Sequence, residues 1–353
     1  MHSKPVSVLI IDDSILVREA AKQILAQQPG IRVMGTAVDP IQAMEKMAQE
    51  WPDVMVLDIQ MPRMDGITFL KKIMAERPTP VVICSTLVGN GAQAGVDALA
   101  AGAVSLISKP KSGVTQFFGD ESDSIVAAVR AAAMTNLSRL RQIASSVQRP
   151  LAPPVVKAPR LAGVGDGRLI ALGASTGGTQ ALETVLTALP ADMPGIVIVQ
   201  HMPVGFSKRF AERLNQDLQL ELREAQNGQR VERGLALLAE SGKQMRLKKE
   251  GGGYCVEVID GPVINRHKPS VDCLFGSVAK VAGRNAIGVL MTGMGDDGAL
   301  GMKEMFDAGS MTVAESEESC VVFGMPRAAI QRGGVHEVLA LNKIAGRLLE
   351  WAS

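Results

Sequence analysis

The stretch "RLIALGASTGGTQALETVLTAL", residues 168–189, joins an apolar run to an amphipathic stretch through a glycine-rich turn. This order predicts a buried strand, a tight turn and a helix. The turn places Ser175 in a G-x-S-x-G pattern, the spacing of a nucleophile elbow, which exposes a serine hydroxyl at the end of a strand. Glycine turns between a strand and a helix also bind phosphate. The nucleophile interpretation is favoured, because no lysine follows as in a Walker loop and the spacing is not G-x-G-x-x-G.

The same alternation of apolar runs and helix-like stretches continues on both sides of this turn. Short runs rich in β-branched residues are separated by amphipathic stretches, which predicts parallel sheets covered by helices on both faces. The expected strands are 6–12, 31–37, 53–58, 80–85 and 103–109, followed by 169–175, 195–201, 236–241, 254–260, 286–292 and 310–316. The predicted fold class is therefore α/β, with two doubly wound parallel-sheet domains.

The composition changes between the two sets of strands. Residues 126–166 contain the end of a helix, followed by a stretch with proline and glycine and no hydrophobic period. Such a stretch is typical of an interdomain linker. We therefore expect one domain over residues 6–125 and a second over residues 167–353.

Composition excludes several classes of function. Aromatic residues make up 3% of the 353 residues and the formal net charge is +1, which argues against a nucleic-acid partner and against attraction to anionic lipid. The sequence has no secretory signal and no apolar run long enough to span a membrane, so we expect no membrane insertion. The four cysteines form no C-x-x-C pair, and a cytoplasmic protein with reduced thiols is expected.

Polar side chains follow four expected strands of the first domain. Asp12 and Asp13 end the first strand, Asp58 the third, Ser85 the fourth and Lys109 the fifth. The carboxyl ends of parallel strands meet at one edge of a sheet, so three carboxylates would lie together there and a divalent cation such as Mg²⁺ would relieve their repulsion. Asp58 could then attack a phosphoryl donor. A lone strand-end aspartate is more often a turn or helix-cap residue, and this interpretation rests on the whole set.

A second set of polar residues accompanies Ser175. His201 ends the next strand and could act as the base that a serine nucleophile requires. Asp296 and Asp297 follow another strand, and a carboxylate there could orient the imidazole. The order serine, histidine, aspartate differs from that of the α/β-hydrolases. A strand-end histidine is often structural and aspartates in a "GDDG" loop are often turn residues, so the three groups count only together.

The first domain resembles the receiver domain of bacterial response regulators. The resemblance covers about residues 6–125 and is carried by "LIIDDS", "VLDIQMPRMDG", "VVICST" and "SKP". It implies a flavodoxin-like fold in which Asp58 accepts a phosphoryl group from a partner histidine kinase. It also implies that Ser85 and Lys109 contact that group. The implied Mg²⁺ ligands are Asp12, Asp13, Asp58 and the backbone carbonyl of Gln60.

The second domain resembles the CheB family of chemotaxis-specific protein-glutamate methylesterases. The resemblance runs over about residues 165–350, and its motifs are "LGASTGG", "VQHMPVGF", "NRHKPSVDCLF", "LMTGMGDDGA" and "ESCVVFGMPRAA". It implies a Rossmann-like α/β esterase domain with Ser175 as nucleophile, His201 as base and Asp297 as orienting acid. From their loop positions, the backbone N–H groups of Thr176 and Met294 are candidates for stabilising the oxyanion.

The resemblance also implies an activity and partners. Members of the family hydrolyse glutamate methyl esters on the cytoplasmic helices of chemoreceptors and deamidate receptor glutamines, with no cofactor for ester hydrolysis. We therefore expect a cytoplasmic enzyme that is recruited to receptor arrays and is regulated by phosphorylation of Asp58.

Three other functions remain open from the residues alone. These are a response regulator whose second domain only binds a partner, a transcriptional regulator and a hydrolase of small esters. A transcriptional regulator would need a basic recognition helix, which the second domain lacks.

One departure from the family concerns "LLAESGKQMRL", residues 237–247, where Glu240 and Gln244 replace a proline and a histidine that are common in relatives. Their effect on substrate contact stays open.

Overall fold

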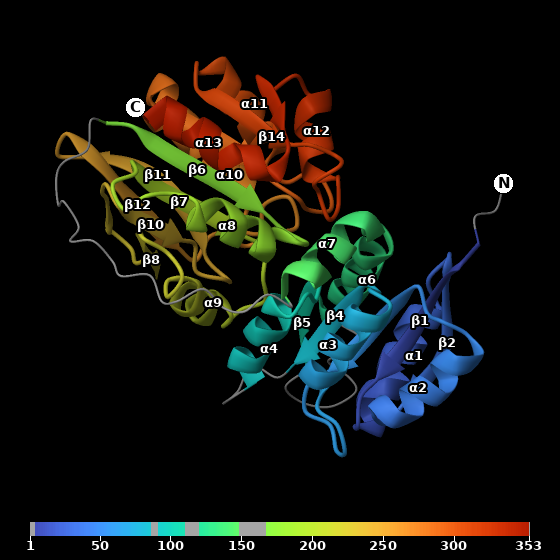
Figure 1. Ribbon diagram of the computed structural model, residues 1–353. Helices are drawn as coiled ribbons and strands as arrows, with labels where there is room; N and C mark the ends of the chain where they lie inside the picture. The colour runs from blue at the N-terminus through green and yellow to red at the C-terminus, as the bar shows by residue number, and fades with distance from the viewer. Residues whose placement is uncertain (1–3, 86–90, 110–119, 148–166, 353) are drawn as a thin grey trace. The chain divides into compact units, whose positions relative to one another are not determined.

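The chain forms two compact units, residues 1–150 and residues 151–353, and each is an α/β structure (Figure 1). The computed structural model describes residues 4–85, 91–109, 120–147 and 167–352. The predicted linker falls partly outside these ranges, because residues 148–166 are not among the described residues.

The first unit has a five-stranded sheet in the order β2-β1-β3-β4-β5, with every pair parallel. This is the flavodoxin-like order expected of the first domain. Its strands are β1 Val6–Ile11, β2 Ile31–Ala37, β3 Val54–Asp58, β4 Val81–Ser85 and β5 Ser105–Ser108. Its helices are α1 Ile15–Ala26, α2 Pro40–Gln49, α3 Gly66–Glu76, α4 Gly91–Ala100, α6 Asp120–Ala133 and α7 Leu137–Val147.

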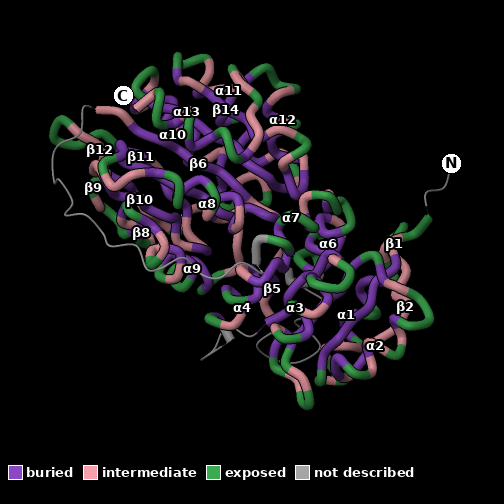
Figure 2. Tube along the Cα trace, viewed as in Figure 1, coloured by how far each residue is buried: buried purple, intermediate pink, exposed green. Residues whose placement is uncertain are grey.

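Helix caps and apolar strands explain why these elements form where they do. The side chains of Asp39 and Asp65 accept hydrogen bonds from the backbone N–H groups of Gln42 and Thr68, which satisfies donors in the first turns of α2 and α3. β3 and β4 are buried along their whole length, as strands covered on both faces should be (Figure 2). The side chains that end these strands are therefore held on a rigid frame.

The second unit has a seven-stranded sheet in the order β15-β14-β13-β6-β7-β10-β8, again all parallel. The predicted α/β class is confirmed for both units. The strands are β6 Leu169–Ala174, β7 Gly195–Gln200, β8 Glu221–Glu224, β10 Leu235–Leu238, β13 Ala286–Leu290, β14 Met311–Glu315 and β15 Glu337–Leu339. The helices are α8 Gly178–Thr187, α9 Ser207–Leu214, α10 Val271–Val281, α11 Ala299–Asp307, α12 Met325–Gln331 and α13 Leu341–Ala352, with a short 3-10 helix at Gly283–Asn285.

β6 marks the point where the strand order of this sheet reverses. From β6 the chain continues to β7 on one side and returns later to β13 on the other. Ligands of open α/β sheets bind outside the carboxyl ends of the strands at such a switch point. The turn after β6, which carries Ser175, lies at that position.

One predicted strand lies outside the parallel sheet. The stretch at 254–260 forms most of β12 Gly253–Ile259, which pairs antiparallel with β11 Gln244–Glu250 and with β9 Arg230–Val231. Gly251 and Gly252, both at positive φ, connect β11 to β12 as a two-residue hairpin turn requires. A hairpin turn is too short for a parallel crossover, and this separates β11 and β12 from the parallel strands.

Two short edge strands, β8 and β15, are not predicted by the sequence. β8 has the sequence "ELRE" and β15 the sequence "EVL", and neither forms an apolar run long enough to indicate a strand. Charged residues at a sheet edge are a common protection against pairing with another chain.

None of the helices in the described part of the chain has both the length and the apolar character needed to cross a membrane.

We predict that Gly177→Ala destabilises the second unit by about 2–4 kcal/mol. Gly177 has φ +76°, and an added Cβ would lie 2.4 Å from Cβ of Val321. Gly346→Ala is the matched control, because a Cβ on Gly346 meets no atom within 4 Å. In α13 it should be neutral or stabilising by up to about 1 kcal/mol. Chemical denaturation measures both, and equal effects of the two substitutions would contradict the strained-turn account.

Candidate active site

A cluster of charged side chains lies where β1 and β3 end in the first unit. Nζ of Lys109 is 2.8 Å from Oδ2 of Asp12 and 2.8 Å from Oδ2 of Asp58. Both aspartates are buried, whereas Asp13 is exposed. The ammonium group therefore bridges two carboxylates that would otherwise repel each other.

Burial governs the ionisation of this cluster. Burial raises the pKa of Asp12 to about 6, the Lys109 charge opposes that rise and the Asp58 charge adds to it. Burial also raises the pKa of Asp58, again against the effect of Lys109. For Lys109 burial alone would lower the pKa, but the two carboxylates hold it above its usual value. The positive charge of Lys109 therefore does not fully offset the cost of burying the two negative charges.

The donor set fits a divalent cation. Carboxylate oxygens of Asp12, Asp13 and Asp58 lie within 4.8 Å of one another. Lys109 offsets one of three negative charges, and the remaining charge favours a hard cation with oxygen ligands, such as Mg²⁺. These residues could hold the ion that the sequence predicts for this edge of the sheet.

The other residues predicted for this site lie beside Asp58 and Lys109. The backbone N–H groups of Ile59 and Gln60 donate hydrogen bonds to the Asp58 carboxylate. Ser85 ends β4, and its backbone carbonyl accepts a hydrogen bond from the N–H of Lys109 at 2.7 Å. Ser85 and Lys109 are therefore neighbours at the carboxyl edge, as expected for residues that contact the same group.

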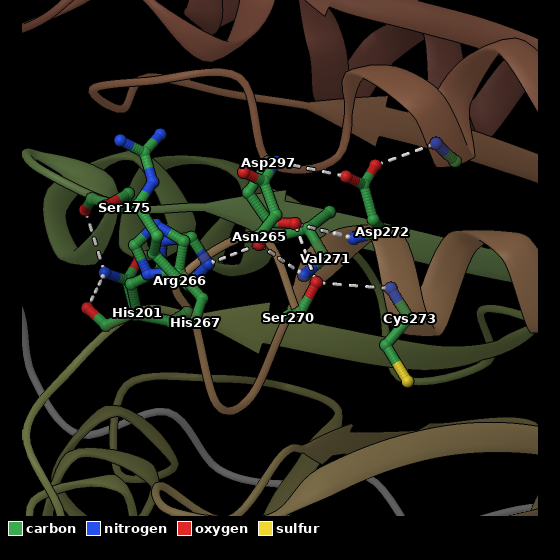
Figure 3. Close-up of polar contacts among 12 residues, drawn as sticks. Ser175, His201, Asn265, Arg266, His267, Ser270, Val271, Asp272, Cys273 and Asp297 are labelled. Carbon is green, nitrogen blue, oxygen red and sulfur yellow. Dashed lines mark hydrogen bonds and ion pairs between the residues drawn. The ribbon is translucent and has the colours of Figure 1, made fainter. Parts of the chain in front are cut away.

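In the second unit, Ser175 and His201 follow two paired strands. β6 and β7 pair with Ala174 opposite Gln200, and the N–H of His201 donates to the carbonyl of Ala174 at 3.1 Å. Nε2 of Gln200 donates to the backbone carbonyls of Ser175, at 2.8 Å, and of His201, at 2.9 Å. These bonds hold the two residues side by side at the carboxyl edge of the sheet (Figure 3).

The loop after β13 closes tightly over Ser175. The N–H of Ser175 donates to the carbonyl of Thr292 at 2.9 Å. A Cβ on Gly293 would lie 2.7 Å from Cβ of Ser175, so glycine is required for this approach. The serine side chain is thereby confined between the ends of β6 and β13 but stays partly exposed.

Asp297 comes from the same loop and is fixed by the N-terminus of α10. It is buried, and its carboxylate accepts four hydrogen bonds. The donors are the Ser270 hydroxyl at 2.7 Å, the Val271 N–H at 2.7 Å, the Asp272 N–H at 3.1 Å and Nε2 of His201 at 2.8 Å. A helix N-terminus favours a negative charge through its free N–H groups and its dipole.

These donors keep Asp297 ionised. Burial by itself would raise the pKa of Asp297, but the hydrogen bond and charge of His201, with the bonds from Ser270 and Asp272, lower it to about 2. A carboxylate can only accept, so Nε2 of His201 carries the proton in their hydrogen bond. Asp297 therefore fixes both the position and the tautomer of the imidazole.

The second ring nitrogen of His201 is left as an acceptor. Nδ1 is buried and has no hydrogen-bond partner among the described residues, so it accepts no hydrogen bond from the Ser175 hydroxyl in this state. In the Ser-His-Asp template the carboxylate binds Nδ1 and the serine faces Nε2. Here Asp297 binds Nε2 instead, which leaves Nδ1 as the ring nitrogen that could accept from a serine.

The predicted oxyanion donors lie in the two loops that flank Ser175. The Thr292 hydroxyl donates a hydrogen bond to the carbonyl of Thr176 at 2.9 Å. The same hydroxyl oxygen accepts a hydrogen bond from the N–H of Val322. Within the described residues, neither the Thr176 nor the Met294 backbone N–H donates a hydrogen bond. Thr292 thus ties the two loops together and leaves both amides available to a ligand.

Several residues that build this site were missed by sequence reasoning. Gln200 joins the strand ends, and Ser270 both caps α10 and binds Asp297. A serine before the apolar stretch at 271–281 is a helix-start signal that could have located Ser270. Gln244, noted in the sequence only as a departure, is fully buried and bonds the carbonyls of Pro262 and His267 and the N–H of Ser270. No local sequence signal marks that role.

We predict that Ser270→Ala destabilises the second unit by about 1–3 kcal/mol near pH 6, because it removes a helix cap and a donor to a buried carboxylate. The lowered pKa of Asp297, about 2, contributes stability above the unfolded pKa of 3.8 that is lost as pH falls through the folded pKa. The substitution raises that folded pKa, so the deficit relative to wild type should shrink towards about pH 3.

The matched control for this measurement is Ser310→Ala. Ser310 is also fully buried, but its hydroxyl donates to the carbonyl of Gly283 rather than to a carboxylate. The loss in free energy of unfolding caused by Ser310→Ala, measured in urea near pH 6 and about pH 3, should not depend on pH through this mechanism. A pH-independent deficit for Ser270→Ala would contradict the assignment of Ser270 as a donor to ionised Asp297.

Comparison with known proteins identifies relatives of both units. A family model for CheB methylesterase matches residues 170–348, and one for the response regulator receiver domain matches residues 8–115. The chain is 55% identical over 356 residues to protein-glutamate methylesterase/protein-glutamine glutaminase 1 of Pseudomonas savastanoi pv. phaseolicola, covering 99% of each chain. It is 58% identical over 349 residues to protein-glutamate methylesterase/protein-glutamine glutaminase 2 of Dechloromonas aromatica, covering 98% of this chain and 97% of the relative.

A solved structure is similar to the second unit. The crystal structure of the CheB methylesterase catalytic domain of Thermotoga maritima aligns with a TM-score of 0.52 and 36% identity, over 53% of this chain and 100% of that chain. The fold, the strand-end residues and these full-length relatives agree. The chain therefore belongs to the CheB methylesterase family, with a response regulator receiver domain in its N-terminal part.

Proposed function

We propose that this protein hydrolyses glutamate methyl esters on the cytoplasmic helices of chemoreceptors, and deamidates receptor glutamines, under the control of phosphorylation. The observation that carries the proposal is the His201–Asp297 pair beside Ser175, with Nδ1 of His201 unprotonated and without a partner in the part of the chain that the structure describes. The relatives named above carry both activities in their names. The catalytic domain spans residues 167–353 and the receiver domain residues 6–125.

Ester hydrolysis proceeds in two stages at Ser175. Its Oγ attacks the ester carbonyl carbon while its proton passes to Nδ1 of His201, and Asp297 stabilises the resulting imidazolium. The bond to the methoxy oxygen breaks, and the proton on Nδ1 moves to that oxygen to release methanol. Water then attacks the glutamyl-serine ester, gives its proton to Nδ1, and Ser175 recovers a proton as glutamate leaves. With glutamine as substrate, ammonia leaves in place of methanol.

The tetrahedral oxyanion of both reactions is stabilised by the backbone N–H groups of Thr176 and Met294. Both amides are free of other acceptors among the described residues and flank Ser175. Fixed donors at the developing charge are an effective means of lowering such a barrier. The chain's own side chains and amides supply every group that this hydrolysis uses, so ester hydrolysis takes no cofactor.

The receiver domain controls the esterase. A histidine kinase of the chemotaxis array donates the phosphoryl group to Asp58. Asp12, Asp13, Asp58 and the carbonyl of Gln60 would hold Mg²⁺, which neutralises charge during the transfer. Ser85 and Lys109 contact the transferred group. The enzyme works in the cytoplasm and is recruited to receptor arrays.

We predict that Ser175→Ala abolishes methanol release from a methylated chemoreceptor. Asp297→Asn should lower kcat by about 10³–10⁴-fold, because an amide that donates to Nε2 favours the tautomer whose Nδ1 carries the proton. Asp296→Asn is the matched control, since the Asp296 side chain is 42% exposed and contacts Asn265, Arg266 and Arg332, which lie outside the proposed catalytic set. Its rate should stay within a few-fold of wild type.

Methanol release from the receptor, compared with hydrolysis of a generic small ester, separates the alternatives. A protein that only binds a partner would release no methanol in any variant. A small-ester hydrolase would prefer the generic ester. Retention of methanol release by Ser175→Ala would refute the proposed nucleophile.

We predict that a small-molecule phosphodonor with Mg²⁺ raises the rate of methanol release by wild-type protein and leaves Asp58→Asn unchanged. Asp123→Asn, which removes an exposed carboxylate on α6, should respond as wild type does. Chelation of Mg²⁺ should remove the response without lowering the basal rate. Equal stimulation of Asp58→Asn, or loss of the basal rate on chelation, would contradict this scheme.

A further inference from the structure

A second histidine lies directly on the ring of His201. The ring centroids of His201 and His267 are 3.7 Å apart and the ring planes differ by 8°, which is a parallel stack (Figure 3). His267 comes from the loop between β12 and α10, far from His201 in sequence. The proposed roles of Ser175, His201 and Asp297 do not account for this stack.

The backbone, rather than the imidazole, holds His267 in place. His267 and Ile264 exchange backbone hydrogen bonds, with N–H to carbonyl distances of 2.9 and 3.1 Å. Nε2 of Gln244 also donates to the carbonyl of His267 at 3.1 Å. The loop can therefore keep its course when the ring is replaced, and the ring is available for a separate purpose.

That purpose follows from how His201 is restrained. Among the described residues its ring makes one hydrogen bond, from Nε2 to Asp297, and finds no partner for the opposite nitrogen. A single hydrogen bond fixes the position of one ring atom but allows the ring plane to tilt about it. A flat neighbour packed against the face of the ring opposes that tilt. Nδ1 is then held in the plane from which it can reach the Ser175 hydroxyl.

We infer that His267 is a positioning residue, whose stacked ring fixes the plane of the His201 imidazole so that Nδ1 stays directed to Ser175. The inference rests on the proposed function, and it adds a residue that acts through the general base without touching the substrate. Small misplacements of a catalytic group cost about 10²-fold in rate.

The charges around His267 suit this role. Burial lowers the pKa of His267 to about 3, and positive charge on His201 and Arg266 lowers it further, against the opposing effects of Asp297 and Asp296. His267 therefore stays neutral while His201 gains a proton during the reaction. A neutral ring tolerates a stacked imidazolium, whereas a second cation would repel it.

The test uses variants that separate the flat ring from its polarity. His267→Phe keeps a flat ring and removes the nitrogens, whereas His267→Gln keeps polarity and removes the ring. We expect Phe to keep kcat for methanol release within about threefold of wild type, and Gln to lower kcat about 10- to 100-fold with little change in KM. Val263→Ala, on the same loop and 63% exposed, is the matched control and should not change either constant.

Each other outcome overturns the inference. A raised KM with unchanged kcat would assign His267 to substrate binding, and equal loss in Phe and Gln would assign a role to the imidazole nitrogens. Wild-type kcat in every variant would leave the stack without a function. Thermal unfolding of each variant is recorded, and His267→Leu replaces Gln if Gln does not fold. Ser175→Ala is run beside them, because activity that survives there rejects the proposed function itself rather than the role of His267.

Discussion

The second unit depends on one buried carboxylate and the helix end that holds it. Asp297 accepts three hydrogen bonds from Ser270, Val271 and Asp272 at the start of α10, and the fourth bond is left for His201. A buried charge without such donors would be strongly unfavourable, so the helix end and the carboxylate stabilise each other. The same arrangement sets the direction of the imidazole, because one carboxylate oxygen serves both Val271 and His201. The hydrogen bonds of Asp297 thus both stabilise the second unit and orient the His201 imidazole.

Both units place their chemistry according to one rule of parallel sheets. In the first unit the strand order changes direction between β1 and β3; Asp12 directly follows β1, and Asp58 ends β3. In the second it changes at β6 and β13, which lead to Ser175 and to the loop that carries Asp297. The strands are buried and rigid, while the loops at their carboxyl ends are free to carry polar groups. The two proposed reactions therefore use the same kind of position in two separate sheets.

The sequence allowed the fold class and the strand-end residues to be predicted, because buried parallel strands are continuous apolar runs whose last residue is easy to locate. That is why Asp58, Lys109, Ser175 and His201 could be named before the structure was known. Features that depend on contacts between distant segments could not be predicted. The stack of His267 on His201, the bonds from Gln244 and the choice of Nε2 as partner of Asp297 all arise from loops whose course no local pattern specifies. The stretch of β12 was predicted as a strand, but its partner β11 was missed because its sequence, "QMRLKKE", is mostly charged and forms no apolar run.

The most direct test of the account is the tautomer of His201 in the resting enzyme. The chain has four histidines, so ¹⁵N-labelled imidazoles can be assigned by nuclear magnetic resonance with single-histidine substitutions. In mildly alkaline solution, we expect that Nε2 of His201 carries the proton in a hydrogen bond to Asp297 and that Nδ1 is unprotonated. A proton on Nδ1, with Nε2 bare, would contradict it, because the general base would then have no acceptor to offer Ser175.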